Sequence, residues 1–298
     1  MAMFVIIGAS GYLGSYLIKN IINSTNDKVI ATYNGAHPSL DRFSDRIIWV
    51  KLDISNPISI DHFCKTELKE GVQYKFIYLA AYHHPDKVEE NPKIAWDINA
   101  ASLDNFLHKA KSNIHSLYYA STDSVYGESV NDHVFIESDP FNPVNTYGRT
   151  KAIAEQIVLM HGFSVIRYSL LMGPSLITKK HFFDFIVESL SNGQSIDMFS
   201  DSYRSVISFD VASYLTIMLL EKYYQKQDII NVAGDLHLSK FDIALGIAKK
   251  LSLDDRFIKP ASIANQDNFG SKRAKSTLIS NGKLKSILKL DNILYDYE

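Results

Sequence analysis

Apolar residues follow two alternating patterns along this chain. Short runs rich in β-branched and aromatic residues alternate with longer segments in which apolar residues recur every three or four positions. The short runs are typical of strands buried on both faces, and the longer segments are typical of amphipathic helices. The expected strands are residues 3–8, 28–33, 47–52, 75–81, 115–121, 164–169 and 229–232, and the expected helices are residues 12–22, 59–69, 92–110 and one that begins near Tyr147. This order predicts an α/β fold, a doubly wound parallel sheet with right-handed crossovers.

Turn-forming residues become denser after Gly173 and Pro174, and this change predicts a second, smaller lobe. We assign residues 1–170 to the domain built on the sheet. Residues 206–233 are expected to return to it, because the last expected strand lies there. Residues 171–205 and 234–298 then form a C-terminal substrate-binding lobe.

Composition narrows the possible partners and surroundings. The net charge of −2 argues against a nucleic acid held mainly through its phosphates. The single cysteine, Cys64, allows no internal disulfide and no cysteine-based zinc site. No apolar run is long enough to span a membrane, and the first residues lack the pattern of a signal peptide. We therefore expect a soluble, cytoplasmic protein without nucleic-acid or membrane partners and without a bound metal.

Glycines recur at positions 8, 11 and 14 in MFVIIGASGYLG, where the first strand leads into the first helix. A dinucleotide site needs Gly8 for the tight turn, Gly11 for close approach of the backbone to a pyrophosphate, and Gly14 for packing of the helix on the strand. The helix N-terminus then offers N–H groups and a positive dipole to the phosphates. The pattern predicts a Rossmann-type domain that binds NAD or NADP.

The end of the second strand bears on the choice between these two cofactors. An acidic residue there would bind the adenosine ribose hydroxyls and repel a 2′-phosphate. The strand instead ends at Tyr33 and Asn34, with His37 and Arg42 following, and contains no carboxylate. NADP is therefore slightly favoured over NAD.

The segment YGRTK places Tyr147 and Lys151 four residues apart, on one face of a helix. A free tyrosine has a pKa of about 10, and a positive charge within a few ångströms can lower it by roughly one to three units. The spacing thus suggests a phenol tuned for proton transfer by the ammonium of Lys151.

Together these motifs resemble the extended short-chain dehydrogenase/reductase family, which includes nucleotide-sugar epimerases and dehydratases. Within it, the chain is most similar to nucleotide-sugar 4-ketoreductases of the dTDP-4-dehydrorhamnose reductase type. The similar segments are AAYHHPDKVEENP at 80–92, STDSVYG at 121–127, ESDPFNPVNTYGRTKAIAE at 137–155, RYSLLMGP at 167–174 and KRAKSTLISNGKL at 272–284.

The resemblance implies further contacts with the dinucleotide. Asp53 would meet the adenine amino group, and Asn99 would lie at the active edge of the sheet or only brace backbone there. The other implied cofactor-binding residues are Ser10, Tyr12, Leu13, Tyr33, Ile54, Leu79, Ala80, Ala81, Tyr147 and Lys151.

The resemblance also implies a reaction, the reduction of a sugar C4 ketone. Tyr147 would protonate the developing alkoxide while Thr122 orients it. Implied substrate-binding residues are Thr122, Asp123, Ser124, His83, Leu170 and Arg204, the last as a contact to the diphosphate of a nucleotide sugar.

Other activities on this fold stay open. Dehydratases typically place Glu after the Thr-Asp pair, where this chain has Ser124, whereas epimerases use the same Tyr and Lys. Some relatives act as non-catalytic regulatory subunits, although these commonly lose one of the three catalytic residues. The resemblance also implies dimers built through two helices. Some related reductases carry a Glu proposed to bind metal where this chain has Tyr16, so it gives no support for a metal.

Overall fold

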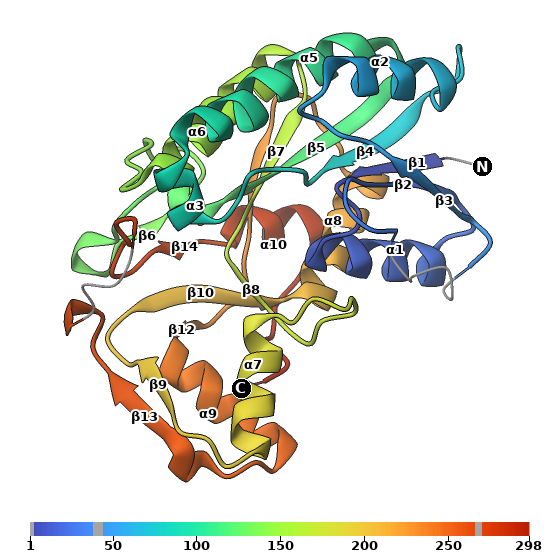
Figure 1. The fold of residues 1–298 in the computed structure, drawn as a ribbon. Coiled ribbons are helices and arrows are strands. Elements are labelled where there is room, and N and C mark those ends of the chain that lie inside the picture. The colour runs from blue at the N-terminus through green and yellow to red at the C-terminus, as the bar shows by residue number, and fades with distance from the viewer. Residues whose placement is uncertain (1–2, 38–43, 266–269, 298) are drawn as a thin grey trace.

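A computed structural model describes residues 3–37, 44–265 and 270–297. Its centre is a seven-stranded parallel sheet with the strand order β3-β2-β1-β4-β5-β7-β11 (Figure 1). These strands are β1 (Met3–Ile7), β2 (Lys28–Tyr33), β3 (Ile47–Lys51), β4 (Tyr74–Tyr78), β5 (Ile114–Thr122), β7 (Ser164–Tyr168) and β11 (Ile229–Val232). The order reverses between β1 and β4, and at such a switch point ligands bind beyond the carboxyl ends of the strands.

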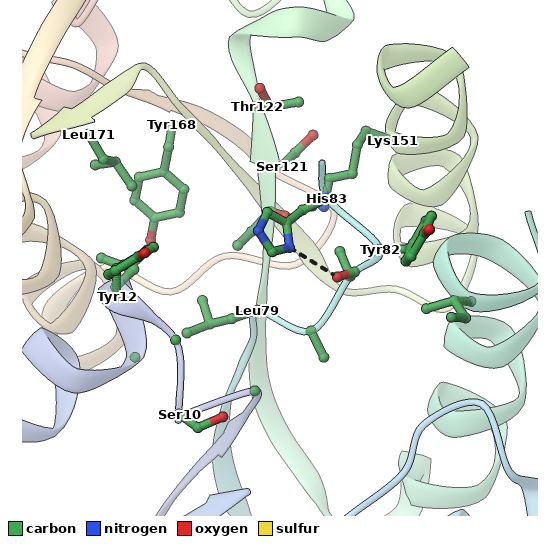
Figure 2. A pocket seen from close by; sticks show the side chains of 18 of the residues that line it. Ser10, Tyr12, Leu79, Tyr82, His83, Ser121, Thr122, Lys151, Tyr168 and Leu171 are labelled. Atoms are coloured by element: carbon green, nitrogen blue, oxygen red, sulfur yellow. Dashed lines mark hydrogen bonds between the residues drawn. The ribbon is translucent and has the colours of Figure 1, made fainter. Parts of the chain in front are cut away.

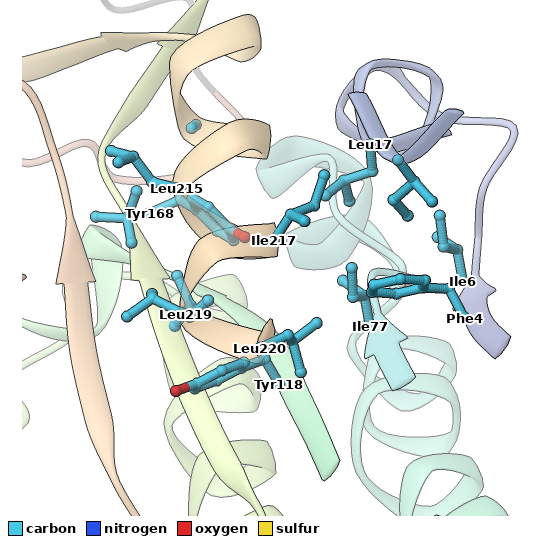
Figure 3. Close-up of a cluster of buried hydrophobic side chains, with 14 of the residues drawn as sticks. Phe4, Ile6, Leu17, Ile77, Tyr118, Tyr168, Leu215, Ile217, Leu219 and Leu220 are labelled. Atoms are coloured by element: carbon cyan, nitrogen blue, oxygen red, sulfur yellow. The ribbon is translucent and has the colours of Figure 1, made fainter. Parts of the chain in front are cut away.

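Helices cover both faces of the sheet, because its strands are apolar on both sides. Phe4 and Ile6 of β1 pack in one core with Leu17 of α1 (Tyr12–Ser24) and Leu215 of α8 (Phe209–Lys222) (Figure 3). Val5 and Ile7 face the opposite core, which is covered by α2 (Pro57–Thr66), α5 (Ser102–Ala110) and α6 (Thr146–Met160). The Rossmann-type α/β fold expected from the pattern is confirmed.

The predicted helix over residues 92–110 is one continuous helical segment in three pieces. These are α4 (Pro92–Trp96), a π-helical turn η2 (Asp97–Ala101) and α5. A π-helical turn of this kind often marks a functional site, and here it turns the side chain of Asn99 inward. Among the helices of the described ranges, none is both long and apolar enough to cross a bilayer.

The second part of the molecule has its own core and lies below the sheet in Figure 1. Its sheets pair β8 (Leu170–Met172) and β12 (His237–Ser239) with β10 (Tyr203–Ser208), and β9 (Ile196–Phe199) with β13 (Ile258–Ala261). Its helices are α7 (Phe182–Ser191) and α9 (Lys240–Leu251).

One stretch that the sequence analysis assigned to the lobe packs on the first domain instead. The strand β14 (Leu278–Ile279) pairs with β6 (Val134–Phe135), and α10 (Gly282–Leu288) buries Leu284 in the same core as Ile230 of the main sheet. Short strands of two residues carry no periodic signal, so the pattern could not reveal this return.

An ion pair connects α3 (Pro85–Glu90) to the segment 270–275. Asp86, on α3, accepts hydrogen bonds from the Nη2 atom of Arg273 at 2.9 Å and from the backbone N–H of Ser271 at 3.0 Å. Asn145, which caps α6, donates to the carbonyl of Lys272 at 2.9 Å. The segment 270–275 is thereby held against the elements that carry the candidate site.

Candidate active site

A cavity of about 890 Å³ lies at the carboxyl ends of the sheet strands and extends to the second lobe. Figure 2 shows its wall, with Ser10 and Leu79 at the glycine-turn end and Thr122 and Lys151 at the other. The predicted site residues that line it are Gly8, Ser10, Gly11, Tyr12, Leu13, Gly14, Tyr33, Asp53, Ile54, Leu79, Ala80, Ala81, His83, Thr122, Asp123, Ser124, Tyr147, Lys151, Leu170 and Arg204. The fold thus gathers residues from most of the chain into one cavity.

The three glycines of the first turn meet different constraints. Gly8 has a positive φ of 86°, and a Cβ there would lie 2.9 Å from the backbone N of Ala80. A Cβ on Gly14 would lie 2.4 Å from the carbonyl O of Ala9. Gly11, by contrast, has φ −83°, and its nearest contact would be an ordinary 3.6 Å to the Gly8 carbonyl. The protein itself therefore requires glycine at 8 and 14 but leaves the space over Gly11 open toward the cavity.

The start of α1 is suited to an anion. Its N-cap, Gly11, offers no side chain to the first N–H groups, and its first turn has no acidic residue. In the turn before this helix, the backbone N–H of Gly8 donates a hydrogen bond to the Thr32 hydroxyl at 2.9 Å, and this bond stabilises the turn. These features fit the phosphates of a dinucleotide.

The part of the cavity along the ends of β2 and β3 could hold an adenosine. Tyr33 lies there with its ring 5.1 Å from that of His37, and no carboxylate ends β2. Asp53 also lines the cavity, but its Oδ1 accepts hydrogen bonds from the N–H and hydroxyl of Ser55 at 2.9 and 2.6 Å. Asp53 therefore shapes a turn as well as facing the cavity. Arg42 lies outside the described residues.

The prediction that Asn99 contacts the cofactor is wrong for this structure. Its side chain is buried behind the cavity wall, where Oδ1 accepts from the Tyr82 N–H at 2.7 Å and Nδ2 donates to the Tyr82 carbonyl at 3.0 Å. Nδ2 also donates to the Thr150 hydroxyl at 3.1 Å. Asn99 thus braces the backbone that follows β4, the alternative left open above.

Tyr147 reaches the site because α6 begins close to the end of β5. Asn145 caps this helix by accepting from the Gly148 N–H at 2.9 Å. A Cβ on Gly148 would lie 2.6 Å from the carbonyl of Ser124, so only glycine lets the helix approach this closely. The glycine of YGRTK therefore brings the Tyr147 phenol next to Thr122.

The expected effect of Lys151 on Tyr147 is not found. Loss of hydration and the nearby Asp123 carboxylate raise the pKa of Tyr147 above its usual value of 10, and a hydrogen bond with Thr122 opposes them. The Lys151 ammonium instead donates to the Ala120 carbonyl at 2.6 Å and lies 4.0 Å from the ring centroid of Tyr119. Burial lowers the pKa of Lys151 to about 7, with the Glu155 carboxylate acting in the opposite direction.

A buried polar network behind Lys151 was missed at the sequence level. Glu155, one helical turn beyond Lys151, pairs with Arg167 at 2.7 Å and accepts a hydrogen bond from the Ser121 hydroxyl. Both charged groups are almost completely buried. The four-residue step from Lys151 to Glu155 was the available signal, since both must lie on one helix face. The network fixes α6 against β5 next to the site.

Three polar residues follow the end of β5 and form a connected group. The Thr122 hydroxyl donates to Asp123 Oδ1 at 3.1 Å and lies 3.2 Å from the Ser124 hydroxyl. Burial raises the pKa of Asp123, while Arg204 and the hydroxyls of Thr122 and Ser124 counteract that rise. Thr122 is therefore oriented by neighbours that also line the cavity.

His83 projects into the middle of the cavity, between Lys151 on one side and Tyr12 and Tyr168 on the other (Figure 2). Its Nδ1 lies 3.4 Å from the Ala81 carbonyl. Loss of hydration lowers the pKa of His83 below 6.5, and the nearby charge of Lys179 acts in the same direction. His83 is thus held mainly neutral near neutral pH, in reach of a ligand.

Arg204 lies on the lobe side of the cavity and is anchored by backbone. Nη2 donates to the Ala274 carbonyl at 2.7 Å, and Nη1 donates to the carbonyls of Tyr203 and Lys275 at 2.8 and 3.0 Å. Of the five N–H groups of a guanidinium, the Nε hydrogen and one Nη2 hydrogen have no acceptor among the described residues. Guanidinium N–H groups suit hydrogen bonds to the oxygens of a phosphate.

Part of the cavity wall comes from a loop to which the sequence analysis gave no role. Ile177, Lys179 and His181 lie between β8 and α7 and line the cavity, together with Phe209. Their sequence has no periodicity, so only the tertiary structure reveals their position.

The fold and the cavity define a class: a Rossmann-type protein of the short-chain dehydrogenase/reductase kind, with Tyr, Lys and Thr at its candidate site. Residues 2–294 match the family described as the RmlD substrate binding domain. The chain belongs to this family.

Known proteins of several activities are similar to the chain. A hypothetical dTDP-4-dehydrorhamnose reductase from Sulfolobus tokodaii superposes with a TM-score of 0.80 and 25% identity, covering 100% of this chain and 98% of the other. The reductase of Bacillus anthracis, solved in complex with NADP, gives a TM-score of 0.79 at 20% identity, covering 99% and 96%. Methionine adenosyltransferase 2 subunit beta from Rattus norvegicus is 24% identical over 294 residues, which is 95% of this chain and 81% of that protein.

Proposed function

We propose that this protein reduces the 4-keto group of a nucleotide-linked sugar, using a reduced nicotinamide dinucleotide. The observation that carries the proposal is that one cavity brings together the open space over Gly11 and the hydroxyls of Tyr147 and Thr122. Membership of the RmlD family and the likeness to the Sulfolobus tokodaii reductase support it.

We assign a nicotinamide dinucleotide as the cofactor because the residues of the cavity suit its phosphates and its adenosine. The uncapped start of α1 and the glycine turn would hold the phosphates, and Tyr33 and Asp53 would flank the adenosine. The missing carboxylate at the end of β2 favours NADP over NAD. When bound, this cofactor supplies the hydride.

The residues around the ketone would supply a proton and hold the substrate. The Tyr147 phenol, whose pKa lies above its usual value, carries its proton at neutral pH and would donate it to the developing alkoxide. Thr122 would hold the same oxygen, since its hydroxyl is oriented by Asp123 and Ser124.

A second function has an observation of its own. The similarity to subunit beta of methionine adenosyltransferase 2 extends over 95% of this chain. A dinucleotide-binding subunit of another enzyme, without turnover of its own, is therefore the alternative.

Incubation of the protein with NADPH and a panel of nucleotide-linked 4-keto sugars separates these functions. The reduced nicotinamide is followed by absorbance and the sugars by mass spectrometry and NMR. We expect cofactor oxidation together with a reduced sugar. A rearranged sugar with the cofactor unchanged would indicate an epimerase, and cofactor binding without turnover on any sugar would support the subunit.

Tyr147→Phe provides the matched variant for this assay. It removes one hydroxyl and keeps the ring, so turnover should fall by about 10²-fold or more while the dissociation constant for NADPH changes little. Retention of activity by this variant would remove Tyr147 from the role of acid.

A further inference from the structure

The loop from Pro174 to His181 is docked on the first two turns of α1. The Tyr16 hydroxyl donates to the Pro174 carbonyl and the Tyr12 hydroxyl donates to the Lys180 carbonyl, both at 2.7 Å. The ring of His181 lies 4.9 Å from that of Tyr12. In Figure 1 this loop, between β8 and α7, reaches from the second lobe toward α1. It therefore forms a wall over the helix start that we assign to the phosphates.

Two adjacent lysines of this loop point to different surroundings. The Lys180 ammonium forms an ion pair with Glu188 of α7, at 2.6 Å. The Lys179 side chain lines the cavity, with its ammonium 5.7 Å from the ring centroid of Tyr12, and its charge acts on His83 across the cavity. No acceptor or carboxylate among the described residues binds the Lys179 ammonium.

We propose that Lys179 binds a diphosphate, namely that of the dinucleotide at the start of α1. The inference rests on the proposed function and adds a residue of the second lobe to the cofactor site. Tyr12, over whose ring the ammonium lies, is the first residue of α1, and no side chain caps the N–H groups at the start of that helix. A cation opposite these donors would complete the neutralisation of an anion with two negative charges.

The diphosphate of a nucleotide sugar is the other possible source of the same chemistry. Arg204, the candidate for that diphosphate, acts electrostatically on Asp123, at the end of β5. Lys179 lies instead over the ring of Tyr12, the first residue of α1, so we assign it to the dinucleotide.

The test is the affinity of the whole protein for dinucleotides, measured by fluorescence energy transfer to the reduced nicotinamide and by calorimetry. Lys179→Ala should raise the dissociation constants of NADPH, NADH and ADP-ribose by a common factor of about ten. Binding of adenosine 2′-monophosphate, which has no diphosphate, should not change. Lys180→Ala is the matched control, because its side chain pairs outside the cavity, and it should bind all four ligands as the wild type does.

Two results would overturn the inference. One is wild-type affinity of Lys179→Ala for ADP-ribose, and the other is an unchanged affinity for dinucleotides with a raised KM for the nucleotide sugar. Failure of the proposed function looks different, because the wild-type protein would then reduce no nucleotide-linked sugar, whatever its affinity for dinucleotides. An unchanged circular dichroism spectrum and melting temperature of Lys179→Ala would show that its fold is intact.

Discussion

The surroundings of Lys151 decide whether its side chain is charged. Its ammonium is buried against the Ala120 carbonyl and the Tyr119 ring, and burial lowers its pKa to about 7, from a usual 10.5. Near neutral pH a large fraction of this lysine is therefore neutral. Its contribution to the site is first a hydrogen bond that joins α6 to β5, and only secondarily a fixed charge.

The lowered pKa predicts how stability depends on pH. Between about pH 7 and pH 10.5 the unfolded chain binds more protons at Lys151 than the folded one, so the free energy of unfolding rises with pH across this window. Lys151→Met removes this contribution. The variant should be more stable than the wild type by up to a few kcal/mol at pH 7 and below, and the gain should vanish toward pH 10.5.

Urea unfolding at a series of pH values measures this difference. Lys93→Met is the control, because Lys93 is 87% exposed and pairs only with Asp97 on its own helix surface. It should leave the pH dependence unchanged. If Lys151→Met and the wild type showed parallel stability curves from pH 6 to pH 10, the buried lysine would not have a lowered pKa.

At the scale of an element, the turn between β1 and α1 separates structural from functional glycines. Gly14 is needed for packing, since a Cβ there would lie 2.4 Å from the Ala9 carbonyl. Gly11 meets no such limit and adopts a backbone conformation open to any residue. We therefore propose that its lack of a side chain serves a ligand rather than the fold.

Two alanine variants test this separation. Gly14→Ala should lower the free energy of unfolding by about 1–3 kcal/mol through overpacking. Gly11→Ala should keep wild-type stability but weaken NADPH binding by about tenfold or more, because its methyl group occupies the phosphate position. Urea unfolding and cofactor titration of both variants provide the readout. Wild-type NADPH affinity in Gly11→Ala would place the phosphates elsewhere.

At the scale of the whole molecule, the site depends on contacts that join the two lobes. The segment 270–277 is attached to Asp86 of α3, to Asn145 at the start of α6 and to Arg204 of β10. The same arginine lines the cavity and keeps two N–H groups for a ligand. Arg204 thus positions a wall of the cavity, and we propose that it also contacts the substrate.

The two roles of Arg204, anchoring the segment 270–277 and contacting the substrate, can be distinguished by two variants. Arg204→Ala should raise the KM for the nucleotide sugar about tenfold to a hundredfold, as expected for loss of a charged hydrogen bond worth about 1.5–3 kcal/mol. Ser202→Ala removes a different hydrogen bond to the same Lys275 carbonyl and should leave KM almost unchanged. Equal effects of both variants would mean that Arg204 acts only by anchoring the segment.

Local patterns were sufficient for most of the first domain. The strands β2 and β11 have the bounds that periodicity predicted, and YGRTK places Tyr147 and Lys151 on one helix face as expected. The elements of the second lobe were harder to predict from the sequence, because its strands are short and pair with distant segments. One example is β10, which pairs with β8 and β12. The sequence analysis therefore recognised the lobe by its turn residues and not by its elements.

The sequence by itself determined the α/β order, the glycine turn and the placement of Tyr147 and Lys151 on one helix face. These features depend on neighbours within one helix turn or one strand, where spacing dictates direction. Only the tertiary structure decided that Lys151 points to Ala120, that the pKa of Tyr147 rises, that Asn99 braces Tyr82 and that Lys179 reaches the start of α1. Each of these depends on burial and on partners distant in the chain, because hydration and charge act through space.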